Sequence, residues 1–213
     1  HGVEVRNIAG EFLTMPENIR KMLLEGVDAL MTNQAGVCIG VSTADCIPVL
    51  LYDEEHHAVA AIHAGWRGTL ARIVHKTIQE MAFTYHTDPK KLKAVIGPGI
   101  SLDSFEVGDE VYEAFEQAAF PMEEIAEQRP NASFSADPAE RERLAAEGNI
   151  VQPLKWHLNL PLCNKQILLH CGVTEENILD CGICTFKHSD EFFSARKLGV
   201  DSGRIYTAIL LEK

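Results

Sequence analysis

The chain has 213 residues, 46% of them hydrophobic and 23% charged, which is an ordinary globular composition with enough apolar residues to bury a core. This composition excludes a disordered or fibrous chain, and no apolar run approaches the roughly 18 residues that a membrane-spanning helix needs. The formal net charge of −12 disfavours binding to polyanions, so we expect no nucleic-acid partner and no membrane partner.

The first half of the chain predicts strands followed by a helix. The stretch Val37–Ala64 is dense in β-branched and small apolar residues, in the segments VCIGVST, IPVLLYD and HAVAAIHAG. We interpret it as two or three buried strands. The stretch Trp66–Met81 carries apolar side chains at three- and four-residue spacing, which predicts one amphipathic helix packed on that sheet.

The second half alternates in the same way. We expect strands and helices in the following order: a strand at Lys93–Gly97, a helix at Val107–Phe120, a polar surface excursion with its own helix at Pro121–Asn149, a helix at Leu158–Cys171, and closing strands at Asn177–Cys181 and Arg204–Leu211. Strands interleaved with helices predict an α+β fold, with a mixed β-sheet flanked by helices in a single layered domain that spans residues 1–213.

The cysteines and the first residues of the chain indicate where in the cell the protein is expected. A chain of this length and apolar content does not need disulfides, so we expect six reduced thiols and a cytoplasmic location. No charged leader followed by an apolar segment marks a secretion signal. The chain begins with His1 rather than Met, so we expect the native start to lie upstream.

Cys46 and His63 form the first candidate site. Cys46 lies between two predicted strands, and His63 ends the next one, so neighbouring strands that end on the same side would bring the two together. A thiolate and an imidazole suit zinc, and a nucleophilic Cys–His pair uses the same residues. A free cysteine can also be a small buried hydrophobe, and the spacing does not separate these alternatives.

A catalytic zinc commonly takes three protein ligands and leaves a fourth position for water or substrate. His1 is a candidate for the third ligand. Several other histidines compete with it: His56, His57, His75, His86, His157, His170 and His188.

Two further segments carry candidate anion-binding arginines. Arg67 lies in a glycine-flanked turn that leads into the predicted helix, where a forked donor could bind phosphate or carboxylate, and a surface salt bridge is the alternative. Arg196 and Arg204, beside small residues near the C-terminus, form a second anion-binding or base-stacking candidate. The pair Cys181 and Cys184 has the spacing of a redox motif, but the other cysteines do not complete two zinc knuckles, so we expect structural thiols.

Several motifs taken together closely resemble the YfiH family. They are TADCIP around Cys46, IHAGWRG around His63, IGPGI at 96–100, FEVG at 105–108, and Cys184-Thr followed by FFSAR at 192–196. The resemblance runs from His1 to the C-terminus. Members of this family are often labelled polyphenol oxidase or laccase and are regarded as purine nucleoside phosphorylases with adenosine deaminase activity.

The resemblance implies a zinc ion held by two histidines and one cysteine, which in this chain are His1, Cys46 and His63. The first histidine of the family lies in a Gln-x-His-Gly element, and His1-Gly2 matches its end, so the chain is expected to lack the family's N-terminal segment. The same ligands also bind copper. The family commonly has cysteine where Gly99 stands, and this departure removes no predicted ligand.

The implied function is that of a zinc-dependent purine nucleoside enzyme. It would cleave adenosine, inosine, guanosine or methylthioadenosine with phosphate to the free base and ribose 1-phosphate, and would deaminate adenosine hydrolytically to inosine. Asp45 is our candidate for the general acid or base, with a turn-capping role as the alternative. Arg67 and Arg196 would bind phosphate, with Ser194 in the same loop as Arg196.

The sequence leaves three rival functions open. A Cys–His amide hydrolase acting on cell-wall precursors would need Cys46 and His63 without a metal. A copper-dependent polyphenol oxidase, or laccase, would need several coppers with many histidine ligands. A non-catalytic module would bind a nucleoside or a metal without turnover.

Overall fold

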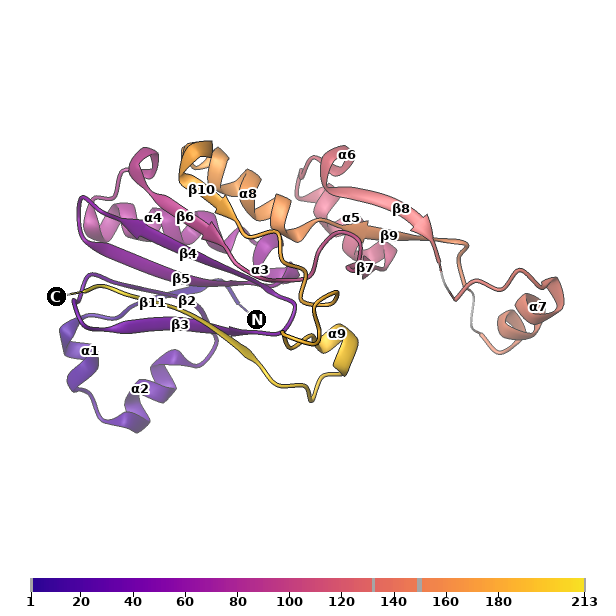
Figure 1. Ribbon diagram of the computed structural model, residues 1–213, viewed down its shortest axis with the longest axis horizontal. Coiled ribbons are helices and arrows are strands. Elements are labelled where there is room, and N and C mark those ends of the chain that lie inside the picture. Colours follow the sequence, from indigo (N-terminus) through magenta and orange to yellow (C-terminus); the bar gives the residue numbers. More distant parts are fainter. Residues whose placement is uncertain (1, 132, 149–150, 213) are drawn as a thin grey trace. The chain divides into compact units, whose positions relative to one another are not determined.

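A computed structural model describes residues 2–131, 133–148 and 151–212 (Figure 1). The chain forms two compact units: a main unit of residues 1–101 and 160–213, and an inserted unit of residues 102–159. The single-domain assignment for residues 1–213 stays a prediction. No helix within the described ranges is long and apolar enough to cross a bilayer.

The main unit is built on a six-stranded mixed sheet. The strand order is β1 (Glu4–Asn7), β2 (Val27–Thr32), β5 (Ala58–Ala64), β4 (Ile47–Asp53), β6 (Lys93–Ile96) and β10 (Ile178–Asp180). The two outer pairs are parallel and the three inner pairs antiparallel. This arrangement confirms the predicted fold class, a mixed sheet with helices.

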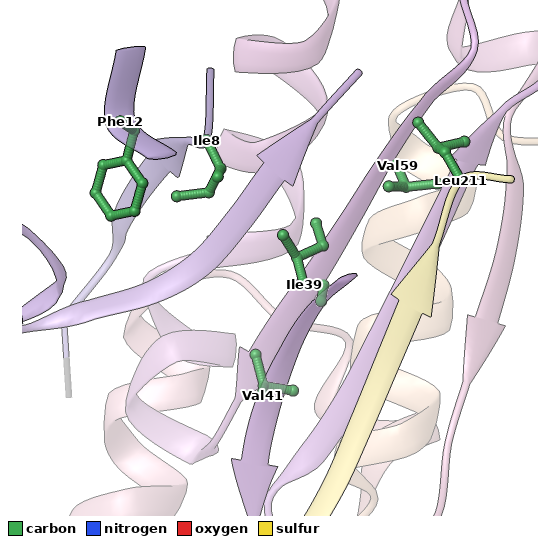
Figure 2. Packing of buried hydrophobic residues seen from close by; sticks show 7 residues of the cluster. Ile8, Phe12, Ile39, Val41, Val59 and Leu211 are labelled. Atoms are coloured by element: carbon green, nitrogen blue, oxygen red, sulfur yellow. The ribbon is translucent and has the colours of Figure 1, made fainter. Parts of the chain in front are cut away.

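A two-stranded antiparallel ribbon, β3 (Cys38–Thr43) with β11 (Ile205–Leu210), covers one side of this sheet (Figure 1). Alternate residues of β3 are buried, as expected for a strand with one face on the core. A cluster of buried side chains fills the space beneath the ribbon (Figure 2): Ile8, Phe12, Ile39, Val41, Val59, Ala61 and Leu211. Apolar burial of this kind stabilises the layering.

Helices cover the other side of the sheet, where α4 (Ile73–Tyr85) and α8 (Leu160–His170) lie in Figure 1. The remaining helical segments of the main unit are α1 (Gly10–Thr14), α2 (Glu17–Leu24), α3 (Trp66–Leu70) and α9 (Ala195–Leu198), with single 3-10 turns at Pro89–Lys91 and Glu175–Asn177. Two or three strands were predicted within Val37–Ala64, and the structure has three, β3, β4 and β5. The predicted helix at Leu158–Cys171 and both closing strands are confirmed as α8, β10 and β11.

The prediction of one helix over Trp66–Met81 is wrong. The structure divides this stretch into α3 and α4, because Arg72 between them adopts a left-handed conformation with φ 59° and ψ 45°. Apolar spacing continues across the break, so periodicity alone could not detect it. The break leaves α3 as a separate short turn that starts directly after Gly65.

The inserted unit holds a three-stranded antiparallel sheet in the order β7 (Glu106–Val107), β9 (Leu154–Leu158) and β8 (Ala126–Pro130). Its helices are α5 (Asp109–Gln117), α6 (Met122–Ile125) and α7 (Pro138–Ala146). The rings of Tyr112 and Trp156 stack with centroids 3.9 Å apart. The helix predicted at Val107–Phe120 is confirmed as α5.

The excursion predicted at Pro121–Asn149 contains its own helix, α7, as expected, and also α6 and the strand β8. Ala132 and Asn149, which belong to that prediction, lie outside the described residues. The sequence did not indicate β8 and β9 because both are short and β8 is largely polar.

Candidate active site

The structure brings Cys46 and His63 together. Strands β4 and β5 are antiparallel, with Ile47 paired to Ala64 and Pro48 to His63, so the start of one strand meets the end of the other. A Cβ atom added to Gly65 would lie 3.0 Å from Cys46 Sγ and 3.8 Å from His63 Nε2. The position that a side chain of Gly65 would occupy, the space beside Gly65, is therefore bordered by a thiol sulfur and an imidazole nitrogen. This donor set suits zinc or copper.

Asp28, which the sequence analysis did not single out, orients His63. His63 Nδ1 donates to Asp28 Oδ1 at 2.8 Å, and the two side chains are only 12% and 10% exposed. A carboxylate only accepts, so Nδ1 carries the proton, and in a neutral ring this tautomer leaves the lone pair on Nε2. A signal existed in the sequence, because Asp28 is the one charged residue in the apolar strand VDALMT.

His1, the third predicted ligand, lies outside the described residues. The backbone N–H of its neighbour Gly2 donates to Asp28 Oδ2. Among the side chains the structure describes, no group of three or more His, Cys, Asp or Glu is arranged to hold a metal ion. Of the three predicted ligands, Cys46 and His63 lie within the described ranges.

The environment of Cys46 opposes a free thiolate. Burial raises the pKa of the Cys46 thiol to about 11, and the negative charges of Asp45 and Asp28 act in the same direction, while Arg204 lowers it. A thiol with this pKa is protonated near neutral pH and is a weak nucleophile by itself. A bound cation reverses this, since a metal-coordinating thiol is deprotonated. The raised pKa therefore counts against a metal-free Cys–His nucleophile, which would need the thiolate.

Asp45, next to Cys46, accepts several hydrogen bonds. Its Oδ1 accepts from Thr185 Oγ1 and its Oδ2 accepts from the backbone N–H of Arg196, both at 2.7 Å. Its backbone is left-handed, with φ 82°, and its carbonyl accepts from Ile100 N–H at 2.8 Å. These contacts favour the turn-capping alternative over the predicted role as general acid or base.

Ser194 and Arg196 lie at the start of α9. Ser194 is buried, and its Oγ accepts from the backbone N–H of Lys197 at 3.2 Å, which makes it the N-cap of this helix. This contact favours a structural role over the predicted contact with substrate. Arg196 is exposed, and its backbone is held by Asp45.

Arg67 is exposed on α3, four residues after His63, and its guanidinium carbon lies 4.1 Å from the centroid of the Trp66 ring. The stacking pre-orders the side chain without consuming its forked donors. The positive charge of Arg204 lowers the pKa of the Cys46 thiol, and its guanidinium donates to the carbonyls of Val200, Ser202 and Gly203.

Cys184 contacts the segment 99–101. It is buried, and its Sγ accepts from the backbone N–H of Ser101 at 3.4 Å. It also forms a parallel bridge with Gly99. A Cβ at Gly99 would lie 2.4 Å from Ile47 Cδ1, so the glycine lets this loop approach β4 closely. These contacts agree with the structural role expected for Cys184.

A cavity of about 250 Å³ reaches the His63–Asp28 pair from the side of β2 and β3. Its walls are largely apolar, and Asp28, Ser42 and His63 supply the polar side chains. Sites that bind small organic molecules commonly have such a lining. The lining residues are Leu24, Val27, Asp28, Leu30, Gly40, Val41, Ser42 and His63.

Comparisons with known proteins point to one family. The family described as "multi-copper polyphenol oxidoreductase laccase" matches residues 1–212. The purine nucleoside phosphorylase of Bacteroides thetaiotaomicron is 42% identical over 206 residues, which cover 97% of this chain and 68% of that protein. Adenosine deaminase RL5, from an unknown prokaryotic organism, is 38% identical over 209 residues, which cover 98% of this chain and 71% of that protein.

Solved structures share the fold. The YfiH protein of Bacillus licheniformis matches with a TM-score of 0.80 at 23% identity, over 100% of this chain and 72% of that one. The Neisseria meningitidis protein NMB0706 matches with a TM-score of 0.72 at 28% identity, with the same coverage. The full-length family match and these identities confirm the resemblance found in the sequence, and the chain belongs to the multi-copper polyphenol oxidoreductase laccase family that includes the YfiH proteins.

Proposed function

We propose that this protein is a metal-dependent purine nucleoside enzyme. It would cleave purine nucleosides with phosphate to the free base and ribose 1-phosphate, and would deaminate adenosine to inosine. The observation that carries the proposal is the convergence of Cys46 Sγ and His63 Nε2 on the space beside Gly65. Two relatives that align with nearly the whole chain, and are named for these two reactions, support it.

The residues have separate tasks in this proposal. Cys46 and His63, with His1, would hold zinc, and Asp28 keeps the proton of His63 on Nδ1. When bound, the metal supplies a Lewis acid that activates water for attack on the purine. In phosphorolysis, phosphate attacks C1′ of the ribose as the base leaves. Arg67 would hold that phosphate, because an arginine fork matches its oxygens.

The test uses the purified chain with its metal content measured on the same batch. Adenosine and inosine are incubated with and without phosphate, and the products are separated by liquid chromatography. Hypoxanthine that depends on phosphate, or inosine formed from adenosine, supports the proposal when the protein also holds about one zinc per chain. Full turnover by a metal-free Cys46→Ala variant would refute it.

Copper chemistry is the second candidate, because the matching family description names a multi-copper oxidoreductase. Imidazole and thiolate ligands bind copper more tightly than zinc by the general affinity order. The same batch, loaded with copper and then with zinc, is therefore assayed on a phenolic substrate as well as on adenosine. Phenol oxidation without purine turnover would assign the site to oxidation.

A further inference from the structure

Asp28 occupies an irregular position in the sheet. Along the parallel pair β1–β2, Glu4 pairs with Val27 and Val5 pairs with Ala29, so Asp28 is the additional residue of a β-bulge. Bulges redirect a side chain and occur beside functional sites. Along the antiparallel pair β2–β5, Ala29 pairs with Ile62, and the next position places Asp28 opposite His63.

The two oxygens of the Asp28 carboxylate serve two different segments of the chain. Oδ1 accepts from His63 Nδ1 at 2.8 Å, and Oδ2 accepts from the backbone N–H of Gly2. The side chain is 10% exposed, so these donors replace most of the water that a carboxylate otherwise holds. A single carboxylate therefore links the end of β5 to the start of the chain.

Gly2 is packed closely at this point. A Cβ added to Gly2 would lie 3.2 Å from the carbonyl oxygen of Gly26, and a Cβ added to Gly68 would lie 3.9 Å from the carbonyl oxygen of Gly2. The backbone of Gly2 is thus held between the turn before β2 and helix α3. Gly2 follows His1 directly in the sequence, so this contact is made by the segment that carries the third predicted ligand.

We propose that Asp28 positions both histidine-bearing segments of the metal site at once. It fixes the tautomer and the ring of His63, and it anchors the residue next to His1. This inference rests on the metal site of the proposed function, but it does not depend on which substrate is turned over. Asp28 is a positioning residue because it acts through His63 and Gly2.

Substitution of Asp28 separates this bridging role from simpler ones. An asparagine side chain has one acceptor oxygen and one donor group, so Asp28→Asn can satisfy only one of the two donors. Asp28→Ala satisfies neither. If the contact with His63 alone mattered, the amide oxygen of Asp28→Asn could replace it with little loss.

A matched control exists elsewhere in the same unit. Asp53 is buried, and its Oδ2 lies 2.9 Å from His56 Nδ1 in the turn between β4 and β5. Asp53→Asn perturbs another aspartate–histidine contact, in which the carboxylate is buried and the histidine is partly exposed. If Asp28 has a merely structural role, Asp28→Asn and Asp53→Asn should lower the melting temperature by similar amounts. Neither substitution should then change the affinity for zinc.

The experiment measures zinc affinity of the full chain by competition with a chromophoric chelator, with no substrate present, and the melting temperature of the metal-free protein. We expect Asp28→Asn to weaken zinc binding about 10- to 100-fold, the range typical of groups that orient metal ligands. Asp28→Ala should weaken it further, and Asp53→Asn should leave it unchanged.

Two outcomes would overturn the inference. One is zinc affinity of Asp28→Asn within about twofold of the unsubstituted chain, which is far less than the loss of an orienting group causes. The other is an unsubstituted chain that binds zinc no more tightly than Cys46→Ala. Zinc binding that depends on Asp28, together with an absence of purine turnover, would refute the proposed function and leave this inference standing.

Discussion

The carboxylate of Asp45 accepts the backbone N–H of Arg196 at 2.7 Å, although the two residues are 151 positions apart in the sequence. The other oxygen of the same carboxylate accepts from Thr185 Oγ1. The residue before Cys46 therefore holds the loop between β10 and α9 against the site. The position of Asp45 next to Cys46 suggested acid–base catalysis. Its contacts instead show a structural role, in which the Asp45 carboxylate holds the loop in place, and we call these two hydrogen bonds the clamp.

Loss of this clamp should be measurable as a local effect. In Thr185→Val, the Asp45 carboxylate loses a buried donor, which should lower the free energy of unfolding by about 1 to 3 kcal/mol. Hydrogen exchange should rise in the segment 184–198. Thr185→Ser keeps the hydroxyl and should behave like the unsubstituted chain. Unchanged exchange in Thr185→Val would show that the hydroxyl does not hold the loop.

Removal of Cys46 or His63, the two proposed metal ligands that the structure describes, should abolish turnover and leave the fold intact. Cys46→Ala and His63→Ala each delete a donor at the space beside Gly65. Circular dichroism should be unchanged, while metal content and formation of purine products fall to background. His56→Ala, which alters a histidine in the turn between β4 and β5, should retain both. Retained metal in both ligand variants would place the metal elsewhere.

Gly65→Ala tests whether the metal binds in the space beside Gly65. The backbone of Gly65, at φ −68° and ψ 171°, is open to alanine, so the change adds only a Cβ 3.0 Å from Cys46 Sγ. We expect metal content to fall with little change in melting temperature, because the methyl group occupies the space between the donors. Gly10→Ala, where the added Cβ meets only Gln34 at 3.7 Å, is the control. Full metal content in Gly65→Ala would contradict this placement of the site.

Arg67 should matter for one of the two proposed reactions. Arg67→Ala removes a cation that phosphorolysis needs and hydrolytic deamination does not. The KM for phosphate should therefore rise about tenfold or more, as expected for loss of a charge-assisted contact, with the deamination rate nearly unchanged. Arg141→Ala is a suitable control, because Arg141 also lies over an aromatic ring, that of Phe134. Equal loss of both activities would indicate damage to the whole site.

Alkaline pH should destabilise the protein through its buried thiols. Burial raises the pKa of Cys163 from 9.0 to about 12. The folded state favours the protonated thiol, so this stabilisation is complete below pH 9 and is lost as pH rises towards 12. Melting temperatures measured from pH 8 to 11 should fall. The fall should be shallower in Cys163→Ala, and an identical slope in the two proteins would exclude this thiol as a cause.

Much of the main unit was predictable, because β3, β4 and β5 are continuous apolar segments bounded by turn residues. The break at Arg72 and the strand β8 were not predictable. A left-handed residue leaves no trace in apolar spacing, and β8 depends on pairing with β9 rather than on its own composition.

The sequence by itself determined the fold class, the family, and the candidacy of Cys46 and His63, because strand periodicity and short motifs are local properties of the chain. Only the tertiary structure decided how the neighbouring residues act. In the folded chain, Asp28 accepts a hydrogen bond from His63, and Asp45 accepts from Thr185 and Arg196. Ser194 caps a helix. The physical reason is that a polar side chain acquires its role from the donors that folding places against it, and these donors come from distant parts of the chain.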